Sequence, residues 1–187
     1  AGVLRDLGRA KEAEPLFRRA LALEERFYGP VHSNVGRALN NLALLLKETN
    51  RLGEAEPLMW RALAIDESFF GPKHPSVARD LNNVGQLLHE LNRLDEAERL
   101  MRRALQIDEE SFGPDHPDVA RDLSNLASLL LAKGSYAKAE PLFRRALAID
   151  ESSFGPDHPS VARDLNNLAQ LLQATNRLAD AEPLMRR

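Results

Sequence analysis

Residues 74–115 read HPSVARDLNNVGQLLHELNRLDEAERLMRRALQIDEESFGPD, and this stretch recurs almost intact 42 residues later. The copy at residues 116–157 reads HPDVARDLSNLASLLLAKGSYAKAEPLFRRALAIDESSFGPD. The same phase holds along the chain, with one histidine every 42 residues at His32, His74, His116 and His158. A fixed period of this size is typical of solenoids, in which each unit contacts only its neighbours. Function in such an array lies on the surface that the stacked units create, so the period favours a binding scaffold over an enzyme.

One repeat predicts two amphipathic helices joined by a short turn. Apolar or small residues recur with helical spacing in its first half, at Leu81, Val84, Gly85 and Leu88. A second such stripe comprises Leu94, Ala97, Met101, Ala104, Leu105 and Ile107. We therefore expect an all-α fold in which the second helix of this repeat runs from about Asp95 to Phe112.

Glycine, asparagine and proline mark the expected helix ends. Asn50, Asn92, Gly134 and Asn176 fall at the turn between paired helices, where a left-handed residue ends a helix. Gly113 and Pro114 form a stop signal, and Pro117 suits the first position of the next helix. Prolines also fall inside the second helices, at Pro15, Pro57, Pro141 and Pro183. We expect these to be tolerated near the end of the first turn, because few N–H groups there have helical partners. Arg99 occupies the same place in one repeat, so the fold does not require proline there.

The bulk composition excludes several kinds of partner. The chain has 187 residues and a net charge of −3, with no basic tail, so nothing favours nucleic acid or an anionic membrane. There is no cysteine, which excludes disulfides and thiol chemistry and fits a reducing, cytoplasmic location. No apolar run approaches the length of a membrane span. We expect no cofactor.

The helix-pair pattern resembles the tetratricopeptide repeat. The small residues that allow close helix approach in that family match Ala55, Ala97, Ala139 and Ala181, and then Ala20, Ala62, Ala104 and Ala146. The apolar position of the first helix matches Leu42, Val84, Leu126 and Leu168. The 42-residue length and the Phe-Gly-Pro-Asp-His-Pro-x-Val-Ala linker look like the kinesin-light-chain type. The resemblance implies an α-solenoid of antiparallel helix pairs in a right-handed superhelix.

The phase divides residues 1–187 into a single array. We expect full repeats at 32–73, 74–115 and 116–157, with partial repeats at 1–31 and 158–187. Ala1 aligns with Ala43 inside a first helix, and Arg187 aligns with Arg145 inside a second helix. We interpret this as an excerpt from a longer array, whose cut ends favour end-to-end self-association.

In this repeat family the first helices line a concave groove, so we carry the groove positions over to this sequence. One row is Arg37, Arg79, Arg121 and Arg163. A second row is Asn40, Asn82, Ser124 and Asn166, and a third is Asn41, Asn83, Asn125 and Asn167. An asparagine side chain offers a donor and an acceptor to a peptide backbone, and a guanidinium can hold a carboxylate through two hydrogen bonds. These rows predict binding of an extended, acidic peptide.

Neighbouring groove positions vary between repeats, as expected of a surface that reads side chains. They are Leu44, Gln86, Ser128 and Gln170, then Lys47, His89, Leu131 and Gln173. Structural roles remain open alternatives for the constant rows. The asparagines can join adjacent helices, the arginines can pair with Asp80, Asp122 or Asp164 of a neighbouring helix, and recent duplication would also keep the copies alike.

Other candidate sites are weaker. The four repeated histidines lie a repeat apart, whereas metal ligands must converge within about 2 Å of one ion, so we expect helix-start hydrogen bonds and no metal site. Trp60 stands where the other copies have arginine and is either a partner contact or a cover for the convex face. No nucleotide-binding, zinc-protease or nucleophile-elbow motif is present, so we expect no enzyme.

The sequence thus predicts a protein–protein interaction scaffold that binds a protein or peptide partner in its groove. The alternative is a structural or oligomerising spacer that regulates an attached effector domain.

Overall fold

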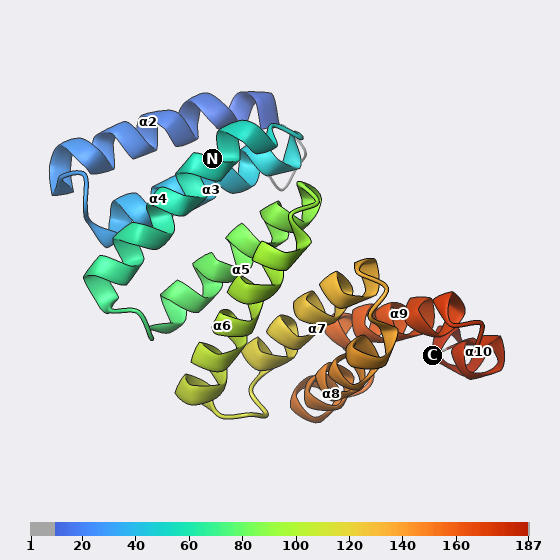
Figure 1. Ribbon diagram of the computed structural model, residues 1–187. Coiled ribbons are helices and arrows are strands. Elements are labelled where there is room, and N and C mark those ends of the chain that lie inside the picture. The colour runs from blue at the N-terminus through green and yellow to red at the C-terminus, as the bar shows by residue number, and fades with distance from the viewer. Residues whose placement is uncertain (1–9, 187) are drawn as a thin grey trace. The chain divides into compact units, whose positions relative to one another are not determined.

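The computed structural model describes residues 10–186. Within that range the chain forms helices and no strands (Figure 1). The helices are α2 (Ala10–Tyr28), α3 (Ser33–Glu48), α4 (Leu52–Phe70), α5 (Pro75–Glu90), α6 (Leu94–Phe112), α7 (Pro117–Ala132), α8 (Tyr136–Phe154), α9 (Pro159–Ala174) and α10 (Leu178–Met185). The all-α prediction is confirmed, and the helix expected at Ala1 lies outside the described residues.

The helices keep the 42-residue phase of the sequence. The first helices α3, α5, α7 and α9 each span 16 residues, and the complete second helices α4, α6 and α8 each span 19 residues. The helix predicted from Asp95 begins one residue earlier, at Leu94, and ends at Phe112 as expected. Equivalent residues in different repeats therefore occupy equivalent helix positions.

The chain divides into two compact units, residues 1–91 and residues 92–187. In the first unit, α2, α3, α4 and α5 pack against one another in chain order. In the second unit, α6, α7, α8, α9 and α10 do the same, and α7 also contacts α9. Successive helices run antiparallel within each unit (Figure 1). The right-handed superhelix expected for the whole array stays a prediction.

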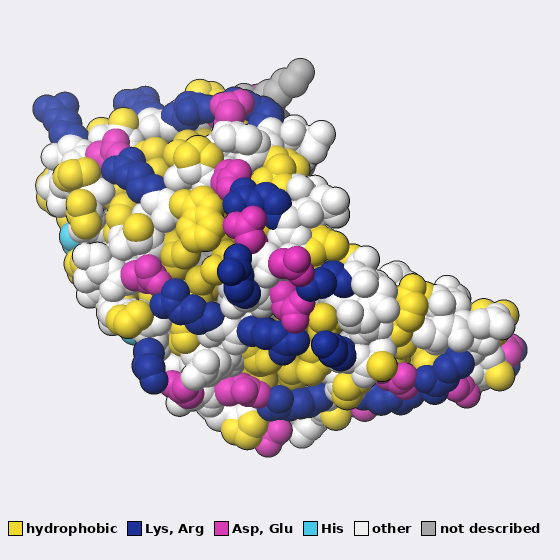
Figure 2. Space-filling model, in the orientation of Figure 1, with side chains coloured by type: hydrophobic (Ala, Val, Ile, Leu, Met, Phe, Trp, Pro, Cys, Tyr) yellow, Lys and Arg dark blue, Asp and Glu magenta, His cyan; other side chains and the backbone are white. Residues whose placement is uncertain are grey.

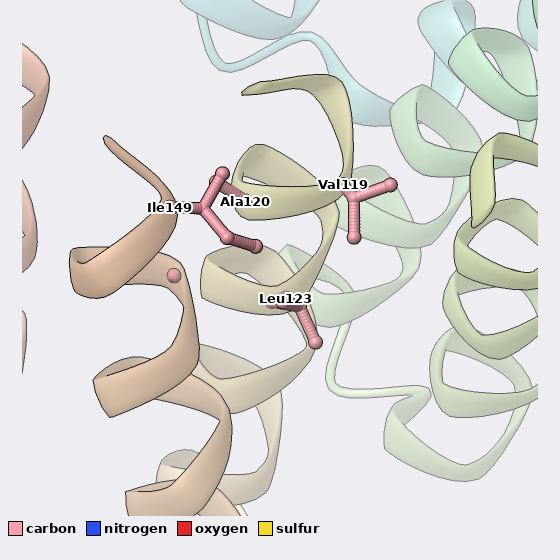
Figure 3. Close-up of a cluster of buried hydrophobic side chains, with 5 residues drawn as sticks. Val119, Ala120, Leu123 and Ile149 are labelled. Atoms are coloured by element: carbon pink, nitrogen blue, oxygen red, sulfur yellow. The ribbon is translucent and has the colours of Figure 1, made fainter. Parts of the chain in front are cut away.

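Small and branched residues form the core between neighbouring helices. In the first unit, Val35 and Leu39 of α3 pack with Ala62 and Ile65 of α4. In the second unit, the equivalent cluster joins α7 to α8 through Val119, Ala120, Leu123, Ala146 and Ile149 (Figure 3). The alanines let the helix backbones approach closely, so a larger side chain there would separate the helices.

The turns adopt the predicted conformations. Asn50, Asn92 and Asn176 have φ values of 58°, 60° and 59°, and Gly134 has a φ of 71°. After Asn50, the N–H of Arg51 donates to the carbonyl of Leu46 over 2.8 Å, which satisfies a carbonyl at the end of α3. The left-handed residue therefore closes each first helix and turns the chain into the next one.

Each second helix continues through its proline where one is present. Pro57 is the sixth residue of α4 counted from Leu52, so it lies in the second turn rather than at the end of the first. It removes one backbone N–H from the helix. The α6 helix has Arg99 at that place and the same length, so the loss does not change the helix boundaries.

Candidate ligand-binding face

The first helices carry the three rows of predicted groove residues. In the first unit these rows lie on α3 and α5, and in the second unit on α7 and α9. Because the four helices share one register, each row presents the same helix position in each repeat. The rows differ in exposure and in hydrogen bonding, which separates candidate contacts from structural residues.

The second row is mostly buried. Asn40, Asn82 and Ser124 are 7%, 2% and 5% exposed, whereas Asn166 on α9 is exposed. Ser124 donates a hydrogen bond from Oγ to Oδ1 of Asp164 over 2.9 Å, joining α7 to α9. A buried polar group needs such a partner, so three of the four positions in this row serve packing between helices.

The third row is half-buried in each repeat. It comprises Asn41, Asn83, Asn125 and Asn167. Asn83 donates from Nδ2 to Oδ1 of Asn40 over 3.1 Å, so one member of this row also links α5 to α3. Asn41 and Asn167 have no side-chain hydrogen bond to any residue that the structure describes. The residues of this row are partly accessible, although Nδ2 of Asn125 is buried and has no hydrogen-bond partner among the described residues.

Three arginines of the first row contact pairs of aspartates. Arg79 Nη2 lies 3.3 Å from Asp66 Oδ2 and 3.1 Å from Asp80 Oδ1. The same triplet recurs in the second unit, where Arg121 contacts Asp108 and Asp122, and Arg163 contacts Asp150 and Asp164. Each arginine thus pairs with the aspartate that follows it on its own helix and with a second aspartate on the preceding helix. The alternative had placed Asp80, Asp122 and Asp164 on a neighbouring helix, which is wrong.

The aspartate pairs are buried deeply enough to change their protonation. Burial raises the pKa of Asp80 to about 6, the charge of Arg79 opposes this shift, and the charge of Asp66 adds to it. Burial likewise raises the pKa of Asp122 to about 7 and that of Asp150 to about 6. Asp66 Oδ1 and Asp80 Oδ2 are buried and receive no hydrogen bond from the described residues. Burial therefore opposes full ionisation of these pairs.

Arg37 is the exception in the arginine row. Its only side-chain hydrogen bond within the described residues is to Asn34 Oδ1, over 3.4 Å. Ala38 stands where the later copies have Asp80, Asp122 and Asp164, so the adjacent carboxylate is missing. The guanidinium of Arg37 is exposed and has no ion pair with any described carboxylate. Of the four arginines, it is the one best placed for an external anion.

The variable positions are accessible but partly occupied by local contacts. Lys47 Nζ lies 3.2 Å from Gln86 Oε1 and 3.1 Å from Glu90 Oε1, which ties α3 to α5. His89 and Leu131 are half-buried at the ends of α5 and α7. Their different side chains give each repeat a distinct chemical surface next to the third row.

The repeated histidines begin the first helices. His32, His74, His116 and His158 each precede a first helix, and each ring accepts at Nδ1 from the backbone N–H two residues later over 3.1–3.2 Å. This confirms the predicted helix-start role. Each ring also stacks on an aromatic residue at the end of the preceding helix, as His74 does on Phe70 with 4.4 Å between centroids. No group of three potential metal ligands occurs among the described residues.

Ion pairs cover the second helices. Arg51 contacts Glu14 at 2.6 Å and Glu54 at 2.7 Å, and Arg177 contacts Glu140 at 2.8 Å in the same way. Figure 2 shows Lys and Arg side chains beside Asp and Glu side chains on the visible face, with hydrophobic side chains among them. Trp60 is 36% exposed, and its Nε1 lies 3.4 Å from Glu56 Oε1. This surface has mixed charge and does not favour one sign of ligand.

Sequence reasoning missed two of these features. It did not identify Asp66, Asp108 and Asp150 as arginine partners, although their 42-residue spacing and apolar surroundings were a usable signal. It also missed Lys133, which contacts Asp95 at 2.7 Å and Glu98 at 2.5 Å. Ser135 occupies the position that Arg51 and Arg177 hold in other copies, so this copy lacks a cation there. Lys133 supplies the cation from a different position, where no other copy has a lysine or arginine.

Among the described helices, none is both long enough and apolar enough to cross a bilayer. The fold and the accessible polar rows define a helical-repeat scaffold. The family model for the tetratricopeptide repeat matches residues 1–68, 51–110, 93–152 and 123–187. The chain therefore belongs to the tetratricopeptide repeat family, whose members generally mediate protein–protein interaction.

Solved structures share the fold at low sequence identity. A kinesin-light-chain-like protein from Podosopora anserina with nearly identical TPR-like repeats is 21% identical, with a TM-score of 0.82 over 98% of this chain and 86% of that chain. BtubC (BKLC) from P. vanneervenii is 23% identical, with a TM-score of 0.85 over 100% of this chain and 74% of that chain. These neighbours confirm the kinesin-light-chain-like type of repeat. No curated protein sequence matches the chain significantly.

Proposed function

We propose that the first helices bind an extended, acidic segment of a protein partner in the predicted groove. The observation that carries this proposal is the third row, in which Asn41, Asn83, Asn125 and Asn167 are partly accessible on α3, α5, α7 and α9. A carboxamide can donate to a peptide carbonyl and accept from a peptide N–H. A row of them supports a peptide backbone without requiring one particular sequence, which leaves selectivity to the variable neighbours.

The preference for acidic residues rests on the arginine row. Arg79, Arg121 and Arg163 already share their charge with buried aspartates, so they contribute less than three isolated cations would. Arg37 has no such partner within the described residues and contributes fully. We therefore propose a modest acidic preference that depends mainly on the first unit. Asn40 and Asn82 are not part of the proposed contact, because both are buried.

Selection from a random peptide library displayed on phage tests this proposal directly. We expect enriched peptides to carry Asp or Glu and to bind the 187-residue chain in calorimetric titration. Asn41→Ala and Asn125→Ala should weaken them, while Trp60→Ala on the second helix α4 should not. Enriched peptides that depend on Trp60 and ignore the first helices would contradict the proposal.

A structural role is the second candidate, because several row residues already join helices. Asn83 contacts Asn40, and Ser124 contacts Asp164. In that case the array spaces or assembles attached domains, and its first helices hold no peptide. A library selection that enriches nothing, together with concentration-dependent assembly in sedimentation velocity, is the outcome that favours this candidate. The proposed role in either case is non-catalytic.

A further inference from the structure

A polar pocket of about 170 Å³ lies where the starts of α3 and α5 meet the end of α4. Its lining includes Ser33, Asn34, Arg37, Asp66, Ser76 and Arg79. We call it the α3–α5 pocket. Since a water molecule takes about 30 Å³ in the liquid, the volume is sufficient for a carboxylate group and a few waters. Two guanidinium groups and two hydroxyl groups reach the same space, and all six residues belong to the first unit.

The charges around the pocket leave one cation without a partner. Arg79 is paired with the buried carboxyl groups of Asp66 and Asp80. Burial raises the pKa of both aspartates, so this pair holds less negative charge than two free carboxylates. Arg37 contacts only Asn34 among the described residues, and no ion pair joins it to Glu24, the residue equivalent to Asp66. The remaining charge at the mouth of the pocket is that of Arg37.

The first copy departs from the three later copies at two positions beside the pocket. Ala38 replaces the aspartate found at Asp80, Asp122 and Asp164. Ser33 replaces the proline found at Pro75, Pro117 and Pro159, which adds a hydroxyl and a backbone N–H at the start of the helix. Both changes favour an anion, because one removes a carboxylate and the other adds hydrogen-bond donors.

We propose that the α3–α5 pocket binds a single carboxylate of the partner segment and thereby fixes the segment's register along the first helices. Arg37 supplies the charge, and the hydroxyl groups of Ser33 and Ser76 donate hydrogen bonds. Arg79 shapes the opposite wall while it remains paired with Asp66 and Asp80. The inference rests on the proposed function and deepens it, because it replaces a uniform row of four arginines by one anchoring position.

The carboxylate can come from an acidic side chain or from the end of a chain, and small probes distinguish the two sources. N-acetyl-aspartate N-methylamide presents a side-chain carboxylate, N-acetyl-alanine presents a terminal one, and N-acetyl-asparagine N-methylamide is the neutral control. Titration of the 187-residue chain is followed by nitrogen–proton NMR at constant ionic strength. We expect the amides of Ser33 and Asn34 and the Nε–H of Arg37 to shift with one or both acidic probes. The Nε–H of Arg163 should stay in place.

Two variants remove the site by different routes. Arg37→Gln removes the cation, and Ala38→Asp keeps it but restores the neutralising partner present in the other copies. Either change should abolish the shifts at Ser33 and Asn34. Arg102→Gln is the matched control, because Arg102 pairs with Glu98 on the same second helix and is 51% exposed. Should Ala38→Asp fail to fold, Arg37→Gln decides alone, because Arg37 is exposed and holds no described ion pair.

The outcomes separate this inference from the proposed function. A library peptide that binds the first helices, combined with no probe shift at Arg37, overturns the pocket and leaves the proposed function standing. Equal shifts at Arg37 and Arg163, or shifts that survive Arg37→Gln, also overturn it. Probe binding at Arg37 without any peptide ligand supports the pocket and removes the peptide-binding function.

Discussion

Asn83 on α5 donates a hydrogen bond from Nδ2 to Oδ1 of Asn40 on α3 over 3.1 Å. Asn40 is 7% exposed and Asn83 is half-buried, so this bond joins a packing residue, Asn40, to a candidate contact residue, Asn83. Position in the sequence repeat does not distinguish these roles, because Asn40 and Asn41 are adjacent and both recur. Burial and hydrogen bonding do distinguish them.

This relationship predicts different effects for the two asparagine rows. Asn40→Ala should lower the free energy of unfolding by about 1 kcal/mol, because it removes a hydrogen bond between helices. Its effect on peptide affinity should be small. Urea denaturation and calorimetric titration of the same variant measure the two quantities. A stable Asn40→Ala variant with much weaker peptide binding would place Asn40 in the ligand site after all.

The aspartate pairs predict a stability that falls as the pH rises. Burial raises the pKa of Asp122 from its ordinary value of 3.8 to about 7, with the charge of Asp108 adding to the shift and that of Arg121 opposing it. His116 and Asp118 also face Asp108 in this cluster. A carboxyl group whose pKa is higher in the folded state binds more protons when folded. Its contribution is therefore present at low pH and is lost as the pH rises from about 4 through about 7.

We expect urea denaturation to show a lower free energy of unfolding at pH 8 than at pH 5, by more than about 1 kcal/mol. Asp122→Asn keeps the shape of the side chain and removes the titration, so it should flatten this dependence. The matched control Asp95→Asn changes an exposed carboxylate and should leave the slope intact. A free energy that rises between pH 5 and pH 8 would show that the pairs are fully ionised in the folded state.

The histidine caps predict a residue-specific loss of helix stability. His158 accepts a hydrogen bond from the N–H of Ser160 over 3.2 Å and stacks on Phe154 with 4.4 Å between centroids. His158→Ala should cost about 1 kcal/mol and speed amide exchange at Ser160, since loss of a cap typically has this size. His158→Asn should recover most of the loss, because asparagine also caps. Phe154→Ala removes the stacking and leaves the hydrogen bond of the cap. Equal amide exchange at Ser160 in His158→Ala, His158→Asn and Phe154→Ala would argue against the cap.

Lys133 predicts a compensating exchange between two positions. Lys133 belongs to the one complete repeat that has a serine, Ser135, where the others have arginine. It contacts Asp95 and Glu98 of the preceding repeat. Lys133→Ala should lower the free energy of unfolding slightly, with a smaller effect in high salt. Adding Ser135→Arg to Lys133→Thr reproduces the residues of the copy with Thr175 and Arg177 and should restore stability. Denaturant melts at low and high salt measure both variants, and failure of the exchange would show that Lys133 acts through packing.

Much of the fold could be predicted because each local signal repeats with the same period. Gly113 and Pro114 set the end of α6, and Pro117 sets the start of α7, from single residues with strong backbone preferences. The pairing of side chains could not be predicted in the same way. Arg79 and Asp66 are separated by a helix end and a linker, and their contact depends on how two helices pack.

The candidate site shows the same limit. The sequence pattern treats Arg37 and Arg79 as equivalent, whereas Ala38 leaves Arg37 without the ion pair that Arg79 has in the described residues. The difference is a single missing carboxylate beside an otherwise constant residue, and its meaning depends on where Asp80 lies in the folded chain. The proposed pocket at Arg37 therefore depends on a departure from the repeat, whereas the proposed contacts of the third row depend on its constant residues.

Calorimetric titration of one double variant tests whether the third asparagine row contacts a partner segment. Asn41→Ala in the first unit and Asn125→Ala in the second remove two half-buried amides, neither of which bonds to Asn40 or to another described side chain. We expect a library-selected peptide to bind the double variant more weakly by about 1–3 kcal/mol, because two polar contacts are lost. The melting temperature should change little. An unchanged affinity together with a strongly lowered melting temperature would show that the row serves helix packing and does not contact a partner.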